Sequence, residues 1–218
     1  MKKSFFILGI ALAVAASAGA QSVVEKFDEN TLGWTESASD CNTGTAVIKK
    51  GVMTVKAKGD GKFMRFAGDV NGNPKSADHP TFETHCYAPL NVKRPFEMVA
   101  NVKTDDLNND RLAGVIFNYK DSGTFYAFVF NKEAVAFLRF VDNKLAGTIM
   151  QDINWGKDNK GKREQTWKLV SNGDDLQFWV NDIELLKVKH MPLDFTGMGF
   201  YTIGKQTLTI DDVTFTQN

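Results

Sequence analysis

Apolar and polar residues alternate along this chain in short runs, and residues that favour tight turns separate the runs. Asp-Ser-Gly at 121–123, Asp-Asn-Lys at 142–144 and Asn-Asp at 181–182 are turns of this kind, and helical periodicity is almost absent. The pattern predicts antiparallel strands joined by hairpins. The predicted strands are 45–50, 52–58, 62–66, 96–104, 112–119, 124–131, 134–141, 145–150, 165–171, 176–181, 184–189, 197–203 and 207–215.

Alternation along each strand also predicts which side chains face the core, because successive side chains point to opposite faces of a sheet. The expected core residues are Trp34, Phe117, Tyr126, Phe128, Phe130, Leu138, Phe140, Trp167, Leu169, Leu176, Phe178 and Val180. The residues expected on the opposite faces are Asn118, Asn131, Arg139, Gln177, Trp179 and Asn181. A single bulge in a strand would invert its assignment.

Residues 1–20 are typical of a signal peptide rather than of a folded segment. Lys2 and Lys3 precede a short apolar run over 5–16, and Ala18-Gly19-Ala20 forms a small-residue cleavage site. The run is too short to span a membrane, and we expect no transmembrane anchor. We therefore expect an exported protein, periplasmic or secreted, with residues 21–218 forming one β-sandwich domain.

The charge balance argues against nucleic acid as a partner. The whole chain has a formal net charge of +0, and the expected signal peptide takes away two Lys and no acid, which leaves 24 basic against 26 acidic residues. Nucleic acids and anionic membranes require a basic surface.

Two cysteines, Cys41 and Cys86, lie in polar, turn-like contexts. In an oxidising compartment a disulfide between them is the favoured interpretation, and two free thiols are the alternative. Metal binding by the pair is the poorer interpretation, because no Cys-x-x-Cys or nearby His pair accompanies them. The three histidines, His79, His85 and His190, are scattered and are interpreted as loop residues.

Four segments resemble the concanavalin A-like lectin/glucanase (laminin-G-like) jelly rolls. They are FDENTLGWTE (27–36), AGVIFNYKDSGTFYAFVF (113–130), TWKLVSNGDDLQFWVNDIELL (166–186) and MGFYTIGKQTLTIDDVTF (198–215). Within this superfamily the chain is similar to the 3-keto-disaccharide hydrolase domain and to related carbohydrate-binding modules. The resemblance covers most of residues 21–218 and implies an all-β, two-sheet antiparallel jelly-roll sandwich.

The chain departs from the family pattern at points that concern activity. Asn118 stands where the family often has Arg, and Asp182-Ile183 stands where Asn-Gly is usual. The E-x-D-x-x-E signature of the laminarinase-like relatives, which places two carboxylates for retaining hydrolysis, is missing. No nucleophile elbow or recognisable triad is present. The sequence therefore favours binding over cleavage and leaves other enzymes open.

Two tryptophans are candidates for stacking on a sugar. Trp179 is expected on an outer face between Gln177 and Asn181. Its ring could stack on the C–H face of a sugar, while the polar neighbours form hydrogen bonds with the sugar hydroxyls. The alternative is that a loop covers Trp179. Trp155, in the segment INWGKDNK, is a candidate contact at the rim of a glycan site or an anchor of its own loop.

Asn118, Asn131 and Arg139 are expected to form the polar floor of a sugar-binding groove, because Asn and Arg supply planar donors. Ordinary solvated polarity on an outer face is the alternative. For metal, Asp28 and Asp211 (or Asp212) come from segments that this fold often places on adjacent strands, and their oxygens would suit Ca²⁺.

The leading hypothesis is an exported, non-catalytic module that binds an oligo- or polysaccharide on a sheet face. One alternative is a glycoside-processing enzyme, a hydrolase or lyase of the 3-keto-disaccharide hydrolase type. The other is a structural or protein-interaction module of the envelope.

Overall fold

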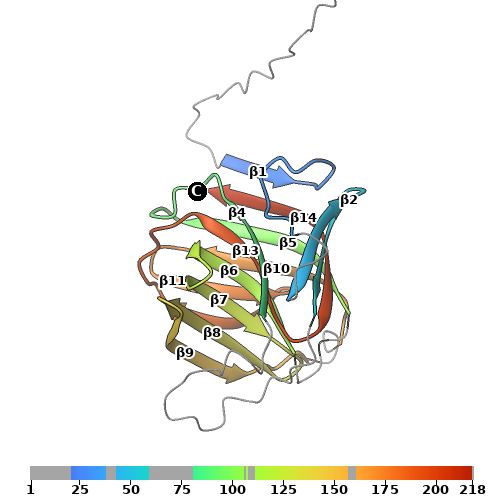
Figure 1. Cartoon of the computed structure of the whole chain (residues 1–218). Coiled ribbons are helices and arrows are strands. Elements are labelled where there is room, and N and C mark those ends of the chain that lie inside the picture. The colour runs from blue at the N-terminus through green and yellow to red at the C-terminus, as the bar shows by residue number, and fades with distance from the viewer. Residues whose placement is uncertain are drawn as a thin grey trace, which may run out of the picture.

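The computed structural model describes residues 21–37, 43–58, 81–105, 107, 111–156 and 161–217. The predicted strand 62–66 and the expected signal peptide lie outside these residues. In the described part of the chain, fourteen strands form two antiparallel sheets that pack face to face (Figure 1). No helix in the same residues is long and apolar enough to cross a membrane.

The large sheet contains both ends of the described chain, since β1 pairs with β14. β1 and β3 lie along the same edge of β14, and β5 lies along its other edge. In spatial order the sheet consists of β12 (Ile183–Lys189), β11 (Asp175–Val180), β10 (Glu164–Ser171), β5 (Phe96–Thr104), β14 (Gln206–Gln217), β3 (Val52–Ala57) and β2 (Gly44–Lys49), with β1 (Gln21–Glu25) beside β14.

The small sheet is a meander of four hairpin-linked strands extended by two further strands. In spatial order it consists of β4 (Thr81–Tyr87), β13 (Gly197–Ile203), β6 (Leu112–Asp121), β7 (Thr124–Phe130), β8 (Ala134–Val141) and β9 (Lys144–Asp152). β4 and β13 come from distant parts of the sequence, so only the tertiary structure brings them together. Strands β1 and β4 are absent from the sequence prediction.

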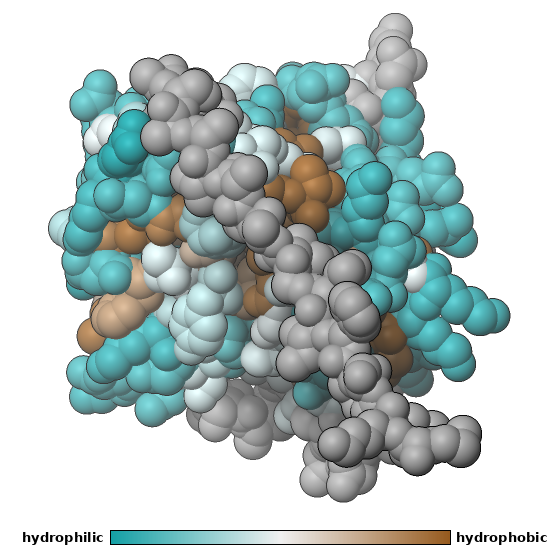
Figure 2. All heavy atoms as spheres, turned by 90° about the horizontal axis from the view of Figure 1, so that it is seen from above, coloured by the Kyte–Doolittle hydropathy of each residue, from teal (hydrophilic) through white to brown (hydrophobic). Residues whose placement is uncertain are grey.

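The main core lies between the two sheets and is rich in aromatic rings. Phe128 of the small sheet stacks on Phe178 of the large sheet with ring centroids 5.6 Å apart, and Phe130 meets Trp167 edge-on at 5.3 Å. Trp34 is buried there as predicted. The predicted core positions on β6, β7, β10 and β11 are confirmed. Figure 2 shows the molecule from above, where the described surface is mostly hydrophilic with separate apolar patches.

The predicted faces of β8 are wrong. Leu138 and Phe140 were expected in the main core, but Val135 and Phe137 occupy it, and Leu138 belongs to a second apolar cluster on the other face of the small sheet. The three-residue connection 131–133 sets the register that pairs Phe130 with Val135. Directly paired residues share a face, so this connection fixes the orientation of the whole strand.

Candidate functional site

Asn118 was expected in the polar floor of a sugar-binding groove, but it does not lie in an open groove. It lies at an irregularity in the β6–β7 pairing, has φ of 50° and is 6% exposed. Its Oδ1 accepts the backbone N–H groups of Asp194 at 2.7 Å and Phe195 at 2.9 Å. The side chain therefore fixes the segment before β13, and the irregularity moves Tyr119 to the opposite face from Phe117.

Asn131 and Arg139 do not complete the predicted floor. Asn131 is 5% exposed, and its Oδ1 accepts the backbone N–H groups of Glu133 and Ala134, each at 2.8 Å. Arg139 is partly buried and pairs with Tyr126, a residue of the main core. The two asparagines thus organise backbone turns, and the three residues form no shared binding surface.

Trp155 is an anchor for its loop and not a rim contact. It is 6% exposed, it packs against Phe130 at 5.8 Å, and its Nε1 donates to the backbone carbonyl of Lys132 at 2.8 Å. A ring held in this way presents no open face to a ligand.

Trp179 lies on the outer face of the large sheet, as predicted. It is partly buried, it pairs with Lys168 of β10, and the Lys168 ammonium group lies 5.1 Å from the ring centroid. Lys168 therefore covers part of the ring by a cation–π contact. Asn181 and Thr166 are the next residues along this face.

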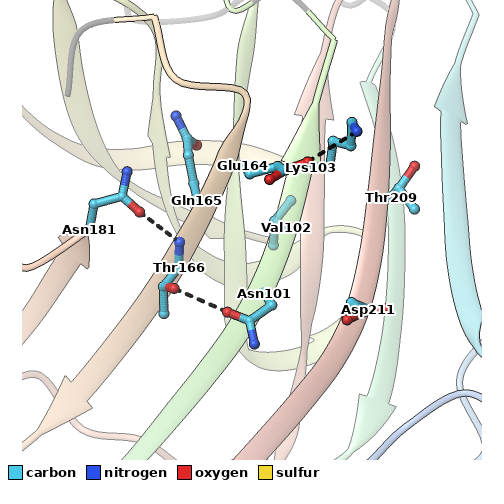
Figure 3. Close-up of a pocket in the computed structure, with 9 residues that line it drawn as sticks. All are labelled: Asn101, Val102, Lys103, Glu164, Gln165, Thr166, Asn181, Thr209 and Asp211. Atoms are coloured by element: carbon cyan, nitrogen blue, oxygen red, sulfur yellow. Dashed lines mark hydrogen bonds and ion pairs between the residues drawn. The ribbon is translucent and has the colours of Figure 1, made fainter. Parts of the chain in front are cut away.

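An open hollow of about 540 Å³ lies on the same outer face of the large sheet (Figure 3). Strands β5, β10 and β14 and the turn after β11 form it. Its lining consists of Asn101, Val102, Lys103, Glu164, Gln165, Thr166, Asn181, Thr209 and Asp211. Except for Val102, these side chains all carry hydrogen-bonding groups.

Hydrogen bonds connect three of these side chains, Asn101, Thr166 and Asn181, and the neighbouring Asp212 in a row that we call the polar row. The row runs across β14, β5 and β10 to the turn after β11. The amide of Asn101 donates to both carboxylate oxygens of Asp212 at 3.1 and 3.2 Å, and the Thr166 hydroxyl donates to Asn101 Oδ1 at 3.0 Å. Asn181 Oδ1 accepts the backbone N–H of Thr166 at 2.9 Å (Figure 3). These hydrogen bonds orient the donor and acceptor groups of the polar row before any ligand binds.

One cation and two carboxylates line the hollow. Lys103 Nζ lies 3.2 Å from Glu164 Oε1, and both side chains are well exposed. Asp211 lies at the irregularity of β14 on the same wall. The lining of the hollow therefore carries one more negative than positive charge.

The predicted calcium ligands lie in separate structural contexts. Asp28 follows β1 and approaches Gly51 in the turn between β2 and β3, while Asp211 lines the hollow. Among the described residues no group of three or more His, Cys, Asp or Glu could hold a metal ion. Calcium binding by Asp28 and Asp211 stays a prediction.

Cys86 lies on the core side of β4, fully buried with a free thiol. Burial raises the pKa of this thiol, and the nearby Glu25 adds to the effect. As a free thiol, Cys86 is therefore protonated at neutral pH. Cys41 lies outside the described residues, so the disulfide stays a prediction.

A second group of polar side chains, which we call the Glu83 cluster, lies on the other sheet and was missed at the level of sequence. It comprises Glu83, His85 and Tyr87 on the outward face of β4 and Tyr119 of β6. Tyr119 donates its hydroxyl hydrogen to Glu83 Oε1 at 2.8 Å, and its ring lies 4.0 Å from the ring of His85. The alternation of Phe82, Thr84 and Cys86 with these outward residues was the signal that could have identified β4.

Burial shifts the titration of the cluster. Burial raises the pKa of Glu83. The hydrogen bond from the Tyr119 hydroxyl lowers this pKa in part, and the negative charge of Asp121 raises it further. Burial lowers the pKa of His85, so its imidazole is neutral at pH 7. Burial and the Glu83 carboxyl raise the pKa of Tyr119, which keeps its proton. Because His85 belongs to strand β4, its interpretation as a loop residue is wrong.

A comparison with protein-family models finds no match to this chain. A comparison with curated protein sequences finds none either.

Solved structures do share the fold. A Bacillus licheniformis β-glucanase superposes with a TM-score of 0.55 at 10% identity over 93% of this chain and 100% of that one. A Bacteroides ovatus GH16 protein of a mixed-linkage glucan locus, in complex with a product, gives 0.55 at 8% identity over 88% and 98%. The catalytic domain of a Thermotoga petrophila laminarinase gives 0.54 at 7% identity over 92% and 98%. The fold is the concanavalin A-like jelly roll that the sequence resemblance implied.

Proposed function

We propose that this protein is an exported carbohydrate-binding β-sandwich that binds an oligo- or polysaccharide in the hollow of the large sheet without cleaving it. The observation that carries the proposal is the polar row of Asp212, Asn101, Thr166 and Asn181 along an open hollow. Amides, hydroxyls and carboxylates are the groups that pair with sugar hydroxyls. Because the row is already ordered, ligand binding loses little conformational entropy.

The size and surroundings of the hollow suit a sugar. Its volume of about 540 Å³ falls within the usual range for small-ligand sites. Trp179 lies on the same outer face, and its partly exposed ring is a surface on which sugar C–H groups can pack. The solved structures that share the fold include proteins named as glucanases, which makes a glycan the first ligand class to test.

Two of the three carboxylates at this site are engaged by neighbouring side chains, which supports binding without cleavage; the third is Asp211. Glu164 forms an ion pair with Lys103, and Asp212 accepts two hydrogen bonds from Asn101. Glycoside hydrolysis needs one carboxyl that gives a proton and a second that acts as base or nucleophile. Carboxylates committed to neighbouring side chains suit ligand orientation better than proton transfer.

The test replaces Thr166 by Val, which removes the hydroxyl and keeps the shape and β-propensity of the side chain. Binding to a panel of soluble glycans is measured by calorimetry for wild type and variant. Since one hydrogen bond contributes about 1 kcal/mol, we expect affinity to fall roughly fivefold to tenfold. Asn101→Ala, which removes the centre of the polar row, is expected to have a larger effect.

Thr214→Val is the matched control, because Thr214 lies on the same sheet face and does not line the hollow. It should bind as the wild type does. A panel without a single bound glycan, or a Thr166→Val variant with unchanged affinity, would contradict the proposal. Release of reducing ends from a bound glycan would instead support the enzyme alternative.

A further inference from the structure

The Glu83 cluster is chemically distinct from the hollow and lies on the other sheet. β4 is an edge strand of the small sheet, and Glu83, His85 and Tyr87 alternate along its outward face. Tyr119 and Tyr87 both lie level with Gly197, and the Tyr119 side chain passes His85 to reach Glu83. Three partly or fully exposed side chains, together with the hydroxyl of the buried Tyr119, thus share one patch.

The carboxylate of this patch has no cationic partner among the residues that the structure describes. Glu83 is partly buried, and it accepts a hydrogen bond from a neutral hydroxyl, that of Tyr119. Asp121 at the end of β6 adds a second negative charge nearby. In the described part of the chain, no Lys or Arg forms an ion pair with either residue. A partly desolvated carboxylate without a counter-charge favours the approach of a cation.

The rings around Glu83 suit a cation that also carries hydrogen-bond donors. Tyr87 is 62% exposed, and its ring meets that of His85 edge-on at 5.7 Å. An exposed tyrosine face attracts an ammonium group. The neutral imidazole of His85 does not repel a positive charge, and its unprotonated nitrogen accepts a hydrogen bond.

We propose that the Glu83 cluster binds a protonated primary amine. The amine forms an ion pair with Glu83, and the rings of Tyr87 and His85 contact it on the solvent side. Two sources carry this chemistry, an amino sugar and a lysine side chain. A metal ion fits less well, because the described residues provide no group of three ligands here.

The experiment titrates the full chain with glucosamine, glucose and Nα-acetyl-lysine amide and follows binding by NMR, with the aromatic resonances of His85 and Tyr87 as reporters. Glucosamine and glucose differ at one position, by an ammonium group in place of a hydroxyl. We expect glucosamine to shift the reporter resonances at concentrations where glucose does not. Tighter binding of glucosamine than of the lysine amide identifies an amino sugar, and the reverse identifies a lysine side chain.

Glu83→Gln should weaken amine binding about tenfold, because the ion pair is lost and the shape is kept. Tyr87→Ala, at an exposed position where folding is not at risk, should weaken it roughly threefold. Glu97→Gln is the matched control on the outer face of the large sheet and should change nothing.

Equal binding of glucose and glucosamine, or amine binding that survives both Glu83→Gln and Tyr87→Ala, overturns the proposal. The outcome is separate from that for the hollow. If glucosamine binds in the hollow, Thr166→Val should weaken its binding and Glu83→Gln should not. If it binds at the Glu83 cluster, Glu83→Gln should weaken its binding and Thr166→Val should not.

Discussion

Asn118 joins two segments that are 76 residues apart in the chain, because its Oδ1 accepts the backbone N–H groups of both Asp194 and Phe195. It also adopts a positive φ of 50°, a conformation that Asn tolerates better than most residues. Both properties make this asparagine a structural residue of the turn before β13.

We predict that Asn118→Ala lowers the free energy of unfolding by about 2–4 kcal/mol. It leaves two partly buried N–H groups without their acceptor, and it adds backbone strain at a positive φ. Urea denaturation followed by tryptophan fluorescence measures the change.

Asn118→Gly separates the two causes, since glycine keeps the backbone conformation and loses only the hydrogen bonds. It should fall between wild type and Asn118→Ala. A Gly variant as unstable as the Ala variant would show that the strained backbone contributes nothing.

At the scale of elements, β13 can join β4 to β6 because it carries glycine where the strands approach most closely. A Cβ at Gly199 would lie 2.0 Å from the carbonyl oxygen of Thr84 on β4. Gly199 therefore determines how close the edge strand, and with it the Glu83 cluster, can lie to the sheet.

We predict that Gly199→Ala destabilises the protein by about 1–3 kcal/mol, because β4 must move away from β13. Gly147→Ala on β9 is the control, since its Cβ would meet its nearest atom, Arg139 Cβ, at an ordinary 4.0 Å. Chemical denaturation of both variants gives the comparison. Equal stability of the two variants would contradict the close packing of β4 on β13.

The hairpin turns were predictable from the sequence, and the register of one hairpin was not. Asp142-Asn143 and Asn181-Asp182 have positive φ at both positions, as two-residue hairpin turns require, and both were identified from residue type alone. The connection at 131–133, which the Asn131 side chain caps, decided which residues of β8 face the core. The irregularity at Asn118 decided which residues of β6 after Phe117 face the core. Neither feature leaves a periodic signal, so the predicted binding floor was wrong.

For the whole molecule, the Glu83 cluster links stability to pH in two opposite ways. The pKa of His85 is lowered, so the unfolded chain takes up a proton on this side chain first as pH falls through about 6.5, and stability decreases. The pKa of Glu83 is raised above 4.5, so the folded chain takes up a proton first, and stability increases as pH falls toward 4.5. The other titratable groups facing His85 are Tyr87 and Tyr119.

We predict that His85→Gln removes part of the stability loss between pH 7 and pH 5. The free energy of unfolding, measured by urea denaturation at several pH values, should fall less steeply for this variant than for wild type. Glu83→Gln should have the opposite effect on the slope near pH 5. Parallel curves for wild type and His85→Gln would contradict a desolvated imidazole.

The sequence by itself determined the fold class, because hydrophobic alternation and turn chemistry are local properties that act within one or two strands. It also placed Trp179 and Asn181 on an outer face, since β11 keeps its alternation from Leu176 to Val180. Only the tertiary structure decided which polar side chains gather into the two sites that we propose. The polar row and the Glu83 cluster each combine residues from strands that are distant in sequence, and long-range strand pairing, not local pattern, brings those residues together.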